Sequence, residues 1–555
     1  MNPSILAAIR CSLLFLVPTV TYAISTQWDL DPVSGDWNTG ANWTPDGVPN
    51  GPADIATFGL SHTTDVSISE DTDVNGIIFT SAATNPYTIT ASPGLTLTIS
   101  SVGIVNISGT TQHFVTAGTG NAGNAGPLRS TAVIKFTNSA TAGSGTAFTN
   151  KGSDTNLTNG GSVEFFNNST AGHATFTNEG GVIPDASGGF TLFNDTSTAG
   201  NGVFLNNGGS TFFFGRATAE NATFTNNAGD TRFFDTSTAG NATITNKGGG
   251  FTTFHGTSTA GSATINNYGP GSFSNPTTEF RGNASAGNAI INNNSGIVGG
   301  DTVFDGFIGS PTAGNATINN NGATLAGELG GVTRFFISFI RSDSGVPTAG
   351  DGTIINNGGT INGAGGGKTF FEDISTAGNS TLIANGGTNG GEGGAIFFED
   401  KSTGGTARIE VFGNGSSDMS GLRGNRGLSV GSIEGDGNVF LGGKNLTVGS
   451  NNLGTTFSGV IQSSGSLTKI GSGTLILSGV NTYTGATTVR RGVLQIDGSI
   501  NSNTFMRNVA TLAGTGTING NVTNNNSGTV IPGAAGVPGV LTVVHNYTRR
   551  NLRIS

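Results

Sequence analysis

The segment Ser237–Asn246, STAGNATITN, is the clearest copy of a pattern that recurs from about residue 140 to about residue 405. In its last six positions the second residue is mostly small, the fourth is Phe or Ile, and the sixth is Asn, with mostly Thr between them. This two-residue alternation is typical of a short strand with one buried face. Because one such strand cannot bury its own large side chain, we expect the copies to stack, so that the repeat is the unit of folding.

Nine copies share this arrangement, with both key positions on the same face of the strand. The large apolar residue is Phe148, Phe176, Phe204, Phe224, Ile244, Ile265, Ile291, Ile318 or Ile354. The amide residue is Asn150, Asn178, Asn206, Asn226, Asn246, Asn267, Asn293, Asn320 or Asn356. We predict an internal column of Phe and Ile, and a column of Asn at a turn, where the amides bond to one another and cap backbone groups.

The Gly of the TAG element indicates the repeat length. Between Gly200 and Gly261 the shortest steps are 20, 20 and 21 residues, and Glu220 replaces the Gly once. Longer steps carry extra Gly, Asn and Ser, as at residues 322–331, 358–367 and 386–394. A core coil of about 20 residues with insertions at one turn predicts a parallel β-helix. We expect the three insertions to line one side of it.

The composition argues against ordinary globular domains and against disorder. Charged residues make up only 10% of the 555 residues, against roughly a quarter in typical domains. The 94 Gly and 16 Pro are numerous, but disordered chains are poor in aromatic residues and this chain has 35 Phe. A thinly spread net charge of −10 indicates no nucleic-acid partner and disfavours anionic membrane surfaces.

Residues 1–23 are typical of a secretory signal. Arg10 supplies a weak positive region, Leu13–Val17 form a short apolar core, and cleavage is expected between Ala23 and Ile24. We expect no membrane-spanning segment in the mature chain, because this run is too short to span a bilayer.

The one cysteine and the five histidines of this chain form no pattern that predicts a metal or cofactor site. The only cysteine, Cys11, lies within the signal, so the mature chain is expected to have no disulfide and no cysteine metal site. The five histidines are scattered without ligand spacing. We predict no metal site and no cofactor.

Residues 24–58 differ from the rest, because all three tryptophans, Trp28, Trp37 and Trp43, occur there among several prolines. One interpretation is sugar stacking on exposed indoles. The other, which we favour, is an aromatic plug that seals the first coil, since solenoids need atypical ends.

The chain then divides by composition. We expect the first coils at 59–115, the TAG-repeat β-helix at 116–412, a polar break at 413–430, and a C-terminal β-helix at 431–555.

The C-terminal region resembles the autotransporter-associated β-strand repeat. The matching residues are Leu467, Lys469, Gly471, Gly473, Thr474, Leu475, Leu477, Gly479, Asn481, Thr482, Tyr483, Thr484, Gly485, Thr487, Val489, Gly492 and Leu494. This resemblance implies a passenger-type β-helix exposed at a bacterial surface. Together with the general crossover preference, it implies a right-handed helix of the pectin-lyase-like type. We expect about 20 to 25 coils in a rod of roughly 100 to 120 Å.

In this family a membrane β-barrel usually follows the passenger and exports it. After Tyr547 the sequence continues only with TRRNLRIS, so the barrel strands are not found here. We expect either a truncated or frameshifted gene or a different route of export.

Acidic residues follow the Phe-Phe dipeptides, as in Glu372-Asp373, Glu399-Asp400 and the single Asp235. Neighbouring coils would bring such carboxylates together, as glycosidic or lyase chemistry requires. Other copies hold Asn, Gly, His or Arg at this position, which favours a solvated turn. The Asn-x-Ser/Thr triplets, for example at Asn221 and Asn241, fall on the repeat and are interpreted as part of its hydrogen-bonded ladder rather than as glycan sites.

We therefore expect an all-β protein, a parallel β-helix with an N-terminal cap. Its expected role is that of a secreted or surface-displayed, monomeric, non-enzymatic adhesin or rod that contacts host or environmental surface ligands or glycans. Secretion across the inner membrane would place it outside the cell or on the outer-membrane surface. The alternatives are a carbohydrate-active β-helix enzyme, either a lyase or a glycosidase, and the remnant of a truncated autotransporter gene.

Overall fold

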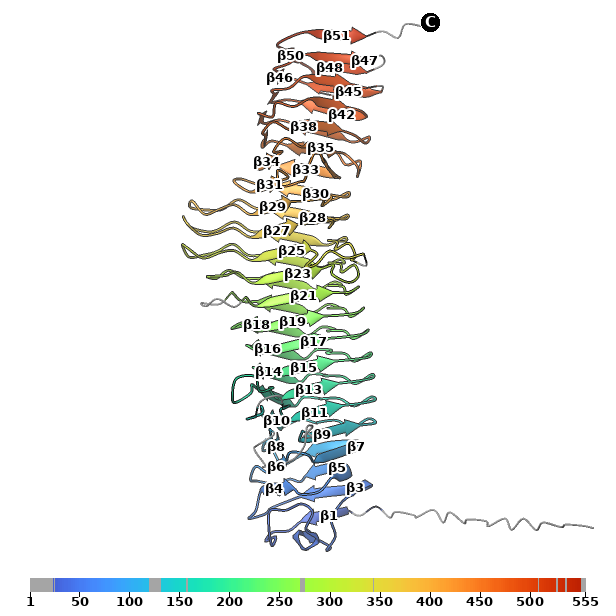
Figure 1. The fold of residues 1–555 in the computed structure, drawn as a ribbon, viewed down its shortest axis with the longest axis vertical. Coiled ribbons are helices and arrows are strands. Elements are labelled where there is room, and N and C mark those ends of the chain that lie inside the picture. The colour runs from blue at the N-terminus through green and yellow to red at the C-terminus, as the bar shows by residue number, and fades with distance from the viewer. Residues whose placement is uncertain are drawn as a thin grey trace, which may run out of the picture.

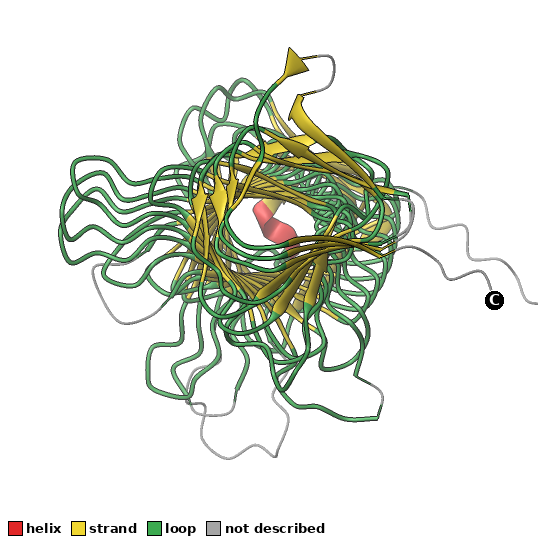
Figure 2. Cartoon of the chain, turned by 90° about the horizontal axis from the view of Figure 1, so that it is seen from above, coloured by secondary structure: helices red, strands yellow, loops and turns green. Residues whose placement is uncertain are grey.

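The computed structural model describes residues 23, 25–118, 131–155, 158–269, 275–342, 344–507, 509–525, 528–534 and 537–550. Its strands stack from β1 at one end of a long rod to β51 at the other (Figure 1). Viewed along the rod, the strands enclose one core and the loops project outward (Figure 2). The predicted parallel β-helix is confirmed. Of the predicted signal cleavage site, Ala23 is described, whereas residues 1–22 and Ile24 lie outside the described residues.

One continuous sheet, called sheet A, contains 19 strands, and its parallel pairing is broken only where β1 pairs antiparallel with β2. In stacking order they are β2 (Trp43–Thr44), β1 (Ser25–Trp28), β3 (Gly51–Phe58), β5 (Thr72–Phe79), β7 (Thr96–Asn106), β9 (Val133–Thr137), β11 (Ser162–Phe165), β13 (Phe190–Phe193), β15 (Ser210–Phe213), β17 (Asp230–Phe233), β19 (Phe251–Phe254), β21 (Thr277–Arg281), β23 (Asp301–Asp305), β25 (Val332–Phe336), β27 (Lys368–Phe371), β29 (Ala395–Phe398), β31 (Ser416–Asp418), β34 (Asn438–Phe440) and β37 (Val460–Gln462).

A second sheet, sheet B, carries the STAGNATITN strands, and its pairing is parallel up to the final antiparallel contact of β48 with β49. Its strands are β4 (Asp65–Ile68), β6 (Thr88–Ala91), β8 (Gln112–Thr116), β10 (Thr146–Asn150), β12 (Thr175–Glu179), β14 (Val203–Asn207), β16 (Thr223–Asn227), β18 (Thr243–Lys247), β20 (Thr264–Asn267), β22 (Ile290–Asn293), β24 (Thr317–Asn320), β26 (Thr353–Asn356), β28 (Thr381–Ala384), β30 (Arg408–Val411), β33 (Ser432–Gly435), β36 (Thr455–Phe457), β39 (Thr474–Leu477), β42 (Gly492–Ile496), β45 (Ala510–Gly514), β48 (Thr529–Ala534) and β49 (Val537–Pro538).

Within the TAG array a third side consists of single bridges between residues of successive coils, which are Thr, as in Thr218 to Thr238, except for Ser285. From residue 428 onward two further parallel sheets appear. Sheet C comprises β32 (Leu428–Val430), β35 (Asn445–Val448), β38 (Ser466–Lys469), β41 (Thr487–Val489), β44 (Thr504–Met506), β47 (Val522–Asn525) and β51 (Tyr547–Arg550). Sheet D comprises β40 (Val480–Asn481), β43 (Ser499–Ile500), β46 (Thr517–Ile518) and β50 (Thr542–Val543). The stretch 413–430 contains β31 and β32, and sheet A runs through it because β31 pairs with both β29 and β34.

Like residues of successive coils lie over one another inside the rod. Phe204 pairs in register with Phe224, and Phe224 with Ile244, and all three are at most 1% exposed. The rings of Phe176 and Phe204 stack with centroids 4.7 Å apart. Ile265 continues the column in register with Ile244. The inward side of sheet B therefore carries a continuous apolar column.

A second column of stacked Phe, which the sequence analysis did not predict, lies on the inward side of sheet A. Its consecutive ring centroids are 4.6 to 5.1 Å apart. Its members are Phe136, Phe165, Phe193, Phe213, Phe233, Phe254, Phe280, Phe304, Phe335, Phe371 and Phe398. The two columns meet edge to face, as between Phe213 and Phe224 at 5.9 Å and 77°. Such aromatic contacts add to the stabilisation that burial alone supplies.

The Asn residues at the ends of the sheet B strands form a ladder inside the corner between sheets B and A. Each Nδ2 donates to the Oδ1 of the next coil at 2.7 to 2.8 Å, from Asn150 to Asn356. The ladder includes Asn178, Asn206, Asn226, Asn246 and Asn267, all 0% exposed. The same amides also donate to backbone carbonyls of sheet A, for example from Asn206 to Asp230 at 2.8 Å. These bonds supply the partners that buried polar groups need.

The three tryptophans pack together at the β1 end of the rod. Trp28, Trp37 and Trp43 are 0% exposed, and they contact one another and Phe58 with ring centroids 5.0 to 6.0 Å apart. The short 3₁₀ helix η1 (Gly40–Asn42) lies between two of them. Because the indoles are buried, the sugar-stacking interpretation does not hold.

Candidate binding face

The outer surface of sheet A carries most of the outward-facing aromatic and arginine side chains of the TAG array. Residues alternate inward and outward along a strand, so in β15 Phe213 points into the core while Phe212 and Phe214 are half-buried on the outside. We call the outward-facing side chains of β13 to β29, with the residue that follows each strand, the aromatic–charged face. It combines stacked aromatic rings with arginine and carboxylate side chains.

The aromatic rings of this face form ladders of their own. Phe214 stacks on Phe234 at 4.7 Å, and Phe234 stacks on His255 at 4.9 Å, with nearly parallel planes. Farther along the rod, Phe370 stacks on Phe397 at 4.8 Å. Because consecutive rings cover one another's faces, each ladder presents mainly ring edges to solvent. Each therefore forms an apolar ridge on the surface.

Arginines are held against these rings. The Arg232 guanidinium lies 5.1 Å from the Phe251 ring and 5.8 Å from the Phe212 ring, and its Nη2 is 2.6 Å from Asp230 Oδ2. Arg334 lies 4.6 Å from the Phe370 ring. Arginine stacked on an aromatic ring loses less conformational freedom on binding, and both residue types are enriched at interface hot spots.

Several groups of the face have shifted pKa values. Burial raises the pKa of Asp301 to about 6, although Arg334 opposes this. Burial also raises the pKa of Glu372, and the nearby carboxylates of Glu399, Asp373 and Asp400 add to the rise. Burial lowers the pKa of His255, and Arg281 and Arg232 lower it further. The negative charge of this face therefore increases as the pH rises through the mildly acidic range.

Sheet B has a different outer surface. In the described strands from β10 to β28, the first two outward positions are Thr, Asn or apolar residues without any charge, as with Thr223 and Thr225 in β16. Across the TAG array the outward-facing Phe and Arg side chains are thus concentrated on the sheet A side, whereas the ion pair of Lys151 with Glu179 lies at the ends of sheet B strands.

Loops border both edges of the aromatic–charged face. The insertions at 322–331, 358–367 and 386–394 all lie at the corner where sheet B leads into sheet A. Their backbones bond to one another, for example Thr360 N–H to Ala323 O and Thr388 N–H to Gly359 O, both at 2.9 Å. These three insertions occupy one side of the rod.

A further insertion, described at residues 337–342 and 344–347, lies at the opposite edge of sheet A. Its Phe339 and Ile340 are 72% and 69% exposed. Phe339 contacts Phe307 edge to face at 6.1 Å, and Arg341 lies 5.5 Å from the Phe307 ring. This insertion shows that long loops do not occur at one turn only.

The aspartates after the Phe-Phe dipeptides stabilise turns by accepting hydrogen bonds from backbone N–H groups. The Oδ2 atoms of Asp235 and Asp373 each accept a backbone N–H of the preceding coil at 2.9 Å. Asp400 accepts the Asp373 N–H at 3.4 Å. All three aspartates adopt φ near +54°, the left-handed region that Asn and Asp tolerate best among residues with side chains. Neighbouring coils bring Glu372, Asp373, Glu399 and Asp400 close enough together to raise the pKa of Glu372.

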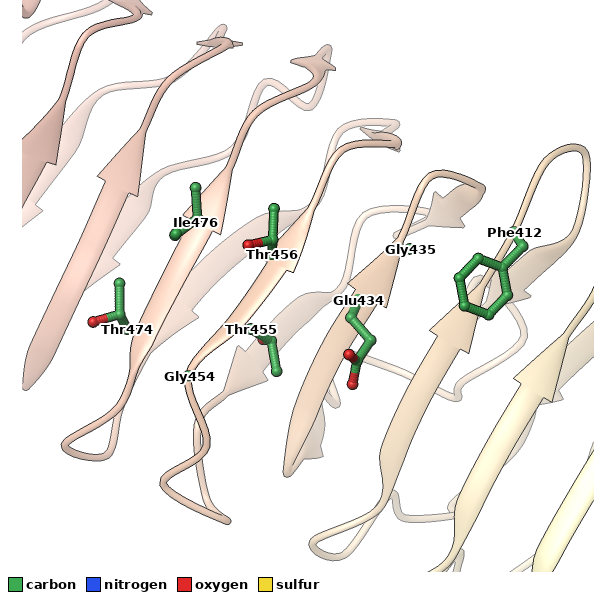
Figure 3. Close-up of a pocket in the computed structure, with 8 residues that line it drawn as sticks. All are labelled: Phe412, Glu434, Gly435, Gly454, Thr455, Thr456, Thr474 and Ile476. Carbon is green, nitrogen blue, oxygen red and sulfur yellow. The ribbon is translucent and has the colours of Figure 1, made fainter. Parts of the chain in front are cut away.

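A small depression of about 370 Å³ lies on the outside of sheet B near its C-terminal part (Figure 3). It forms where β33 and β36 are paired at only one position, Gly435 with Phe457. Its lining residues are Phe412, Glu434, Gly435, Gly454, Thr455, Thr456, Thr474 and Ile476. Arg408 forms an ion pair with Glu434, and Glu434 supplies the one carboxylate of the lining. The sequence offered no signal for this site.

The residues of the C-terminal repeat motif serve close coil packing. A Cβ atom on Gly471, Gly473 or Gly485 would lie 1.9 to 2.3 Å from a backbone carbonyl oxygen of the previous coil. Leu475 is 0% exposed. The Asn481 Oδ1 accepts the Ile461 N–H at 3.0 Å. Glycine is therefore required at these three positions because no side chain fits there.

Tyr483 is fully buried, and its hydroxyl lies 2.7 Å from Thr487 Oγ1. Burial raises the pKa of Tyr483 to about 12. The tyrosine therefore stays neutral in the core, where its hydroxyl has a partner.

Lys469 of the same repeat is 1% exposed, and burial lowers its pKa from 10.5 to about 8. Its ammonium donates to the carbonyl oxygens of Ile470 and, at 3.2 Å, Gly471. Between pH 8 and 10.5 the unfolded chain binds the proton that the folded chain has lost, so stability should rise with pH across this window. Each pKa unit corresponds to about 1.4 kcal/mol.

We expect Lys469→Met to abolish this rise, because the substitution removes the titrating group. Urea unfolding, monitored by hydrogen exchange in the C-terminal coils at pH 7.5, 9 and 10.5, measures it. The exposed Lys401→Met serves as the control and should keep the wild-type pH profile. A rise that persists in Lys469→Met would assign the effect to another group.

Comparisons with known proteins match short parts of the chain. Residues 467–496, from β38 to the end of β42, match the family described as Passenger-associated-transport-repeat. The protein named extracellular serine protease from Serratia marcescens is 48% identical over 91 residues, which are 16% of this chain and 8% of that protein. The Adhesin BmaC autotransporter of Brucella suis biovar 1 (strain 1330) is 40% identical over 111 residues, 18% of this chain and 3% of that protein.

These relatives are far longer than the matched segments, and this chain spans less than a tenth of their length. No solved structure matches the chain. The chain is built as a parallel β-helix, and its repeat at residues 467–496 makes it similar to autotransporter passenger proteins. Among the described residues, no helix is long and apolar enough to cross a bilayer. Nor does this part of the chain group three or more His, Cys, Asp or Glu side chains as metal ligands.

Proposed function

We propose that this chain is a secreted or cell-surface passenger that acts as a non-enzymatic adhesin or surface rod, and that the aromatic–charged face contacts its ligand. The concentration of outward-facing Phe and Arg side chains on one side of the rod supports this proposal. Interfaces are enriched in these residue types and depleted of Lys, Glu and Ser. The bordering insertions supply variable loops on a rigid scaffold, which is where binding residues are usually found.

The proposed location follows from the class of the chain. One relative is named an autotransporter adhesin and another an extracellular protease, so both names refer to proteins outside the cytoplasm. The signal-like segment 1–23 supports secretion across the inner membrane to the outer-membrane surface or the medium. The ligand would be a host or environmental surface component or glycan, and a monomer suffices because a single face carries the groups.

The double variant Arg232→Ser/Phe234→Ser tests the binding face. Both side chains are outward-facing, so the core columns stay intact, and we expect adhesion to fall roughly tenfold or more, as for hot-spot residues. Bacteria that display the chain, or beads coated with it, are measured for adherence to host cells and to matrix and glycan surfaces.

The control is Thr225→Ser/Thr245→Ser on the outer surface of sheet B, which should adhere like the wild type. If both double variants adhere equally well, the aromatic–charged face does not contact the ligand.

The competing function is a carbohydrate-active enzyme, which the adjacent carboxylates of Glu372 and Glu399 favour, since burial and neighbouring charges raise the pKa of Glu372. We propose instead that the aspartates next to them stabilise turns by accepting backbone N–H groups, and that the glutamates belong to the ligand-binding face. The purified chain is incubated with pectins, alginates and host glycans, and new reducing ends or unsaturated products are measured. Turnover that is lost in Asp373→Asn or Asp400→Asn would establish the enzyme in place of the adhesin.

A further inference from the structure

A column of residues that includes six exposed asparagines lies at the corner before the sheet B strands of the TAG array. Most of these asparagines follow the Gly of the TAG element, as Asn241 does, whereas Asn221 follows Glu220, which replaces that Gly. Its backbone N–H bonds to the previous coil, from Asn221 to Gly200 O at 3.0 Å and from Asn241 to Glu220 O at 2.7 Å. The side chains are exposed and form hydrogen bonds from coil to coil: Asn241 Nδ2 donates to Asn221 Oδ1 at 3.3 Å, and Asn315 Nδ2 donates to Asn288 Oδ1 at 3.2 Å.

This corner column is separate from the buried ladder. The ladder residue of the same strand is Asn226 in the first case and Asn246 in the second, both 0% exposed. The Asn-x-Ser/Thr triplets at Asn221 and Asn241 therefore lie outside the buried ladder and belong to a second, exposed set of hydrogen bonds between coils. The hydroxyl residue of each triplet is also outside, because Thr223 and Thr243 are the first, exposed residues of β16 and β18.

Four members of the corner column stand in such triplets. They are Asn221-Ala-Thr223, Asn241-Ala-Thr243, Asn315-Ala-Thr317 and Asn379-Ser-Thr381, and in all four the Asn is exposed. An Asn with Ser or Thr two residues later is the acceptor of N-linked sugars, which require a surface position in a secreted protein. Two other exposed members, Asn201 and Asn288, have Val203 and Ile290 at that place.

We propose that this corner column is a site of N-glycosylation, with sugars carried by the Asn residues that have Thr two positions later. The bond that forms joins the Asn Nδ2 to the anomeric carbon of the sugar. The bond that breaks joins that carbon to the phosphate of an activated sugar donor, which a cellular glycosyltransferase uses. The phosphate leaves with the electron pair, and the amide loses one proton.

The structure constrains the sugar that fits. Asn221 and Asn241 belong to adjacent coils and touch through their amides, so branched glycans on both would collide. Single sugars, or a sugar on one of the two, satisfy this spacing. The corner also lies apart from sheet A, since the Thr bridge of the third side separates them along the chain. Sugars there leave the aromatic–charged face uncovered, so this modification does not depend on the adhesive role.

Peptide mass spectrometry on the full chain, purified from the organism that makes it, tests the proposal. We expect mass increments of whole sugar residues on peptides that contain Asn221, Asn241, Asn315 or Asn379. The matched internal controls, Asn201 and Asn288, are equally exposed on the same column and should be unmodified.

Two variants test whether the modification requires the hydroxyl residue of the triplet or only an exposed Asn. Thr243→Val keeps the shape of an outward-facing residue and should remove the sugar from Asn241, whereas Thr243→Ser should retain it. The proposal is overturned if all four Asn are unmodified. It is equally overturned if Asn201 and Asn288 carry sugar as often as the four, or if Thr243→Val leaves the sugar in place.

Discussion

Replacing Phe213 with Ala should lower the local free energy of unfolding by about 3 to 5 kcal/mol, the usual cost of deleting a buried Phe side chain. Phe213 is 0% exposed, and its ring stacks between Phe193 at 4.8 Å and Phe233 at 4.7 Å. It also meets the sheet B column at Phe224. Neighbouring coils cannot close the cavity without breaking register, because each ring stands in a column fixed by backbone pairing on both sides.

Native-state hydrogen exchange suits this measurement, because a stack of coils opens locally rather than as one unit. The loss of protection should centre on β15 and its two neighbours in sheet A. The adjacent Phe212→Ala is the matched control, since Phe212 is half-buried on the outside, and its cost should stay below about 1 kcal/mol. Equal costs for the two substitutions would mean that the inner column does not hold the coils together.

Replacing Asn226 with Asp should destabilise the same region by about 3 to 5 kcal/mol at neutral pH, as an uncompensated buried charge does. Asn226 Nδ2 donates to Asn246 Oδ1 at 2.8 Å and to Phe251 O at 3.1 Å, and a carboxylate can donate to neither. Its Oδ1 accepts from Asn206 and Thr231, and those bonds survive the change. The loss of stability therefore comes from the repulsion between the carboxylate and two acceptor oxygens, Asn246 Oδ1 and Phe251 O.

This effect should depend on pH with a definite sign. Burial raises the pKa of a carboxyl group, so the folded variant holds its proton longer than the unfolded chain does. Stability of the variant then falls as the pH rises above about 4, the ordinary value for Asp. Hydrogen exchange at pH 4.5 and 7 measures the difference, and the exposed neighbour Asn227→Asp is the control. A variant whose stability at pH 7 matches that of Asn227→Asp would contradict the buried ladder as a source of stability.

The repeat and its inner column could be predicted because one short pattern, apolar at the fourth position and Asn at the sixth, recurs at nearly constant spacing. Stacking then follows from burial alone. The column on sheet A was missed partly because many of its members stand next to a second Phe. In Phe213-Phe214 either ring could face inward, and only the corner geometry decides which one does. Because the inward residue of each pair could not be predicted, the outward residue could not be predicted either. Most of the aromatic rings of the aromatic–charged face belong to these outward-facing residues.

The two kinds of Asn illustrate a second limit. Asn221 and Asn226 are five residues apart in one repeat. The Asn226 position is Asn in nine copies, and the Asn221 position is Asn in five of these and Gly, His, Ser or Asp in the other four. Asn221 is exposed because it lies at the corner before the strand. Asn226 is buried because it ends the strand and points inside the next corner. A periodic pattern indicates which residues are equivalent between coils, but it does not indicate where the chain bends. Bends depend on backbone contacts between coils that a linear sequence does not display.

The in-register pairing of every coil with the next has a consequence for how such a rod can change over generations. A coil presents the same set of side chains upward as the coil above presents downward, so removing or duplicating one whole repeat leaves two matching surfaces to join. Near-identical repeats are also where recombination between gene copies takes place most readily. The length of the molecule can therefore drift in whole steps, each adding or removing one layer, while the two ends and the chemistry of the remaining layers stay unchanged.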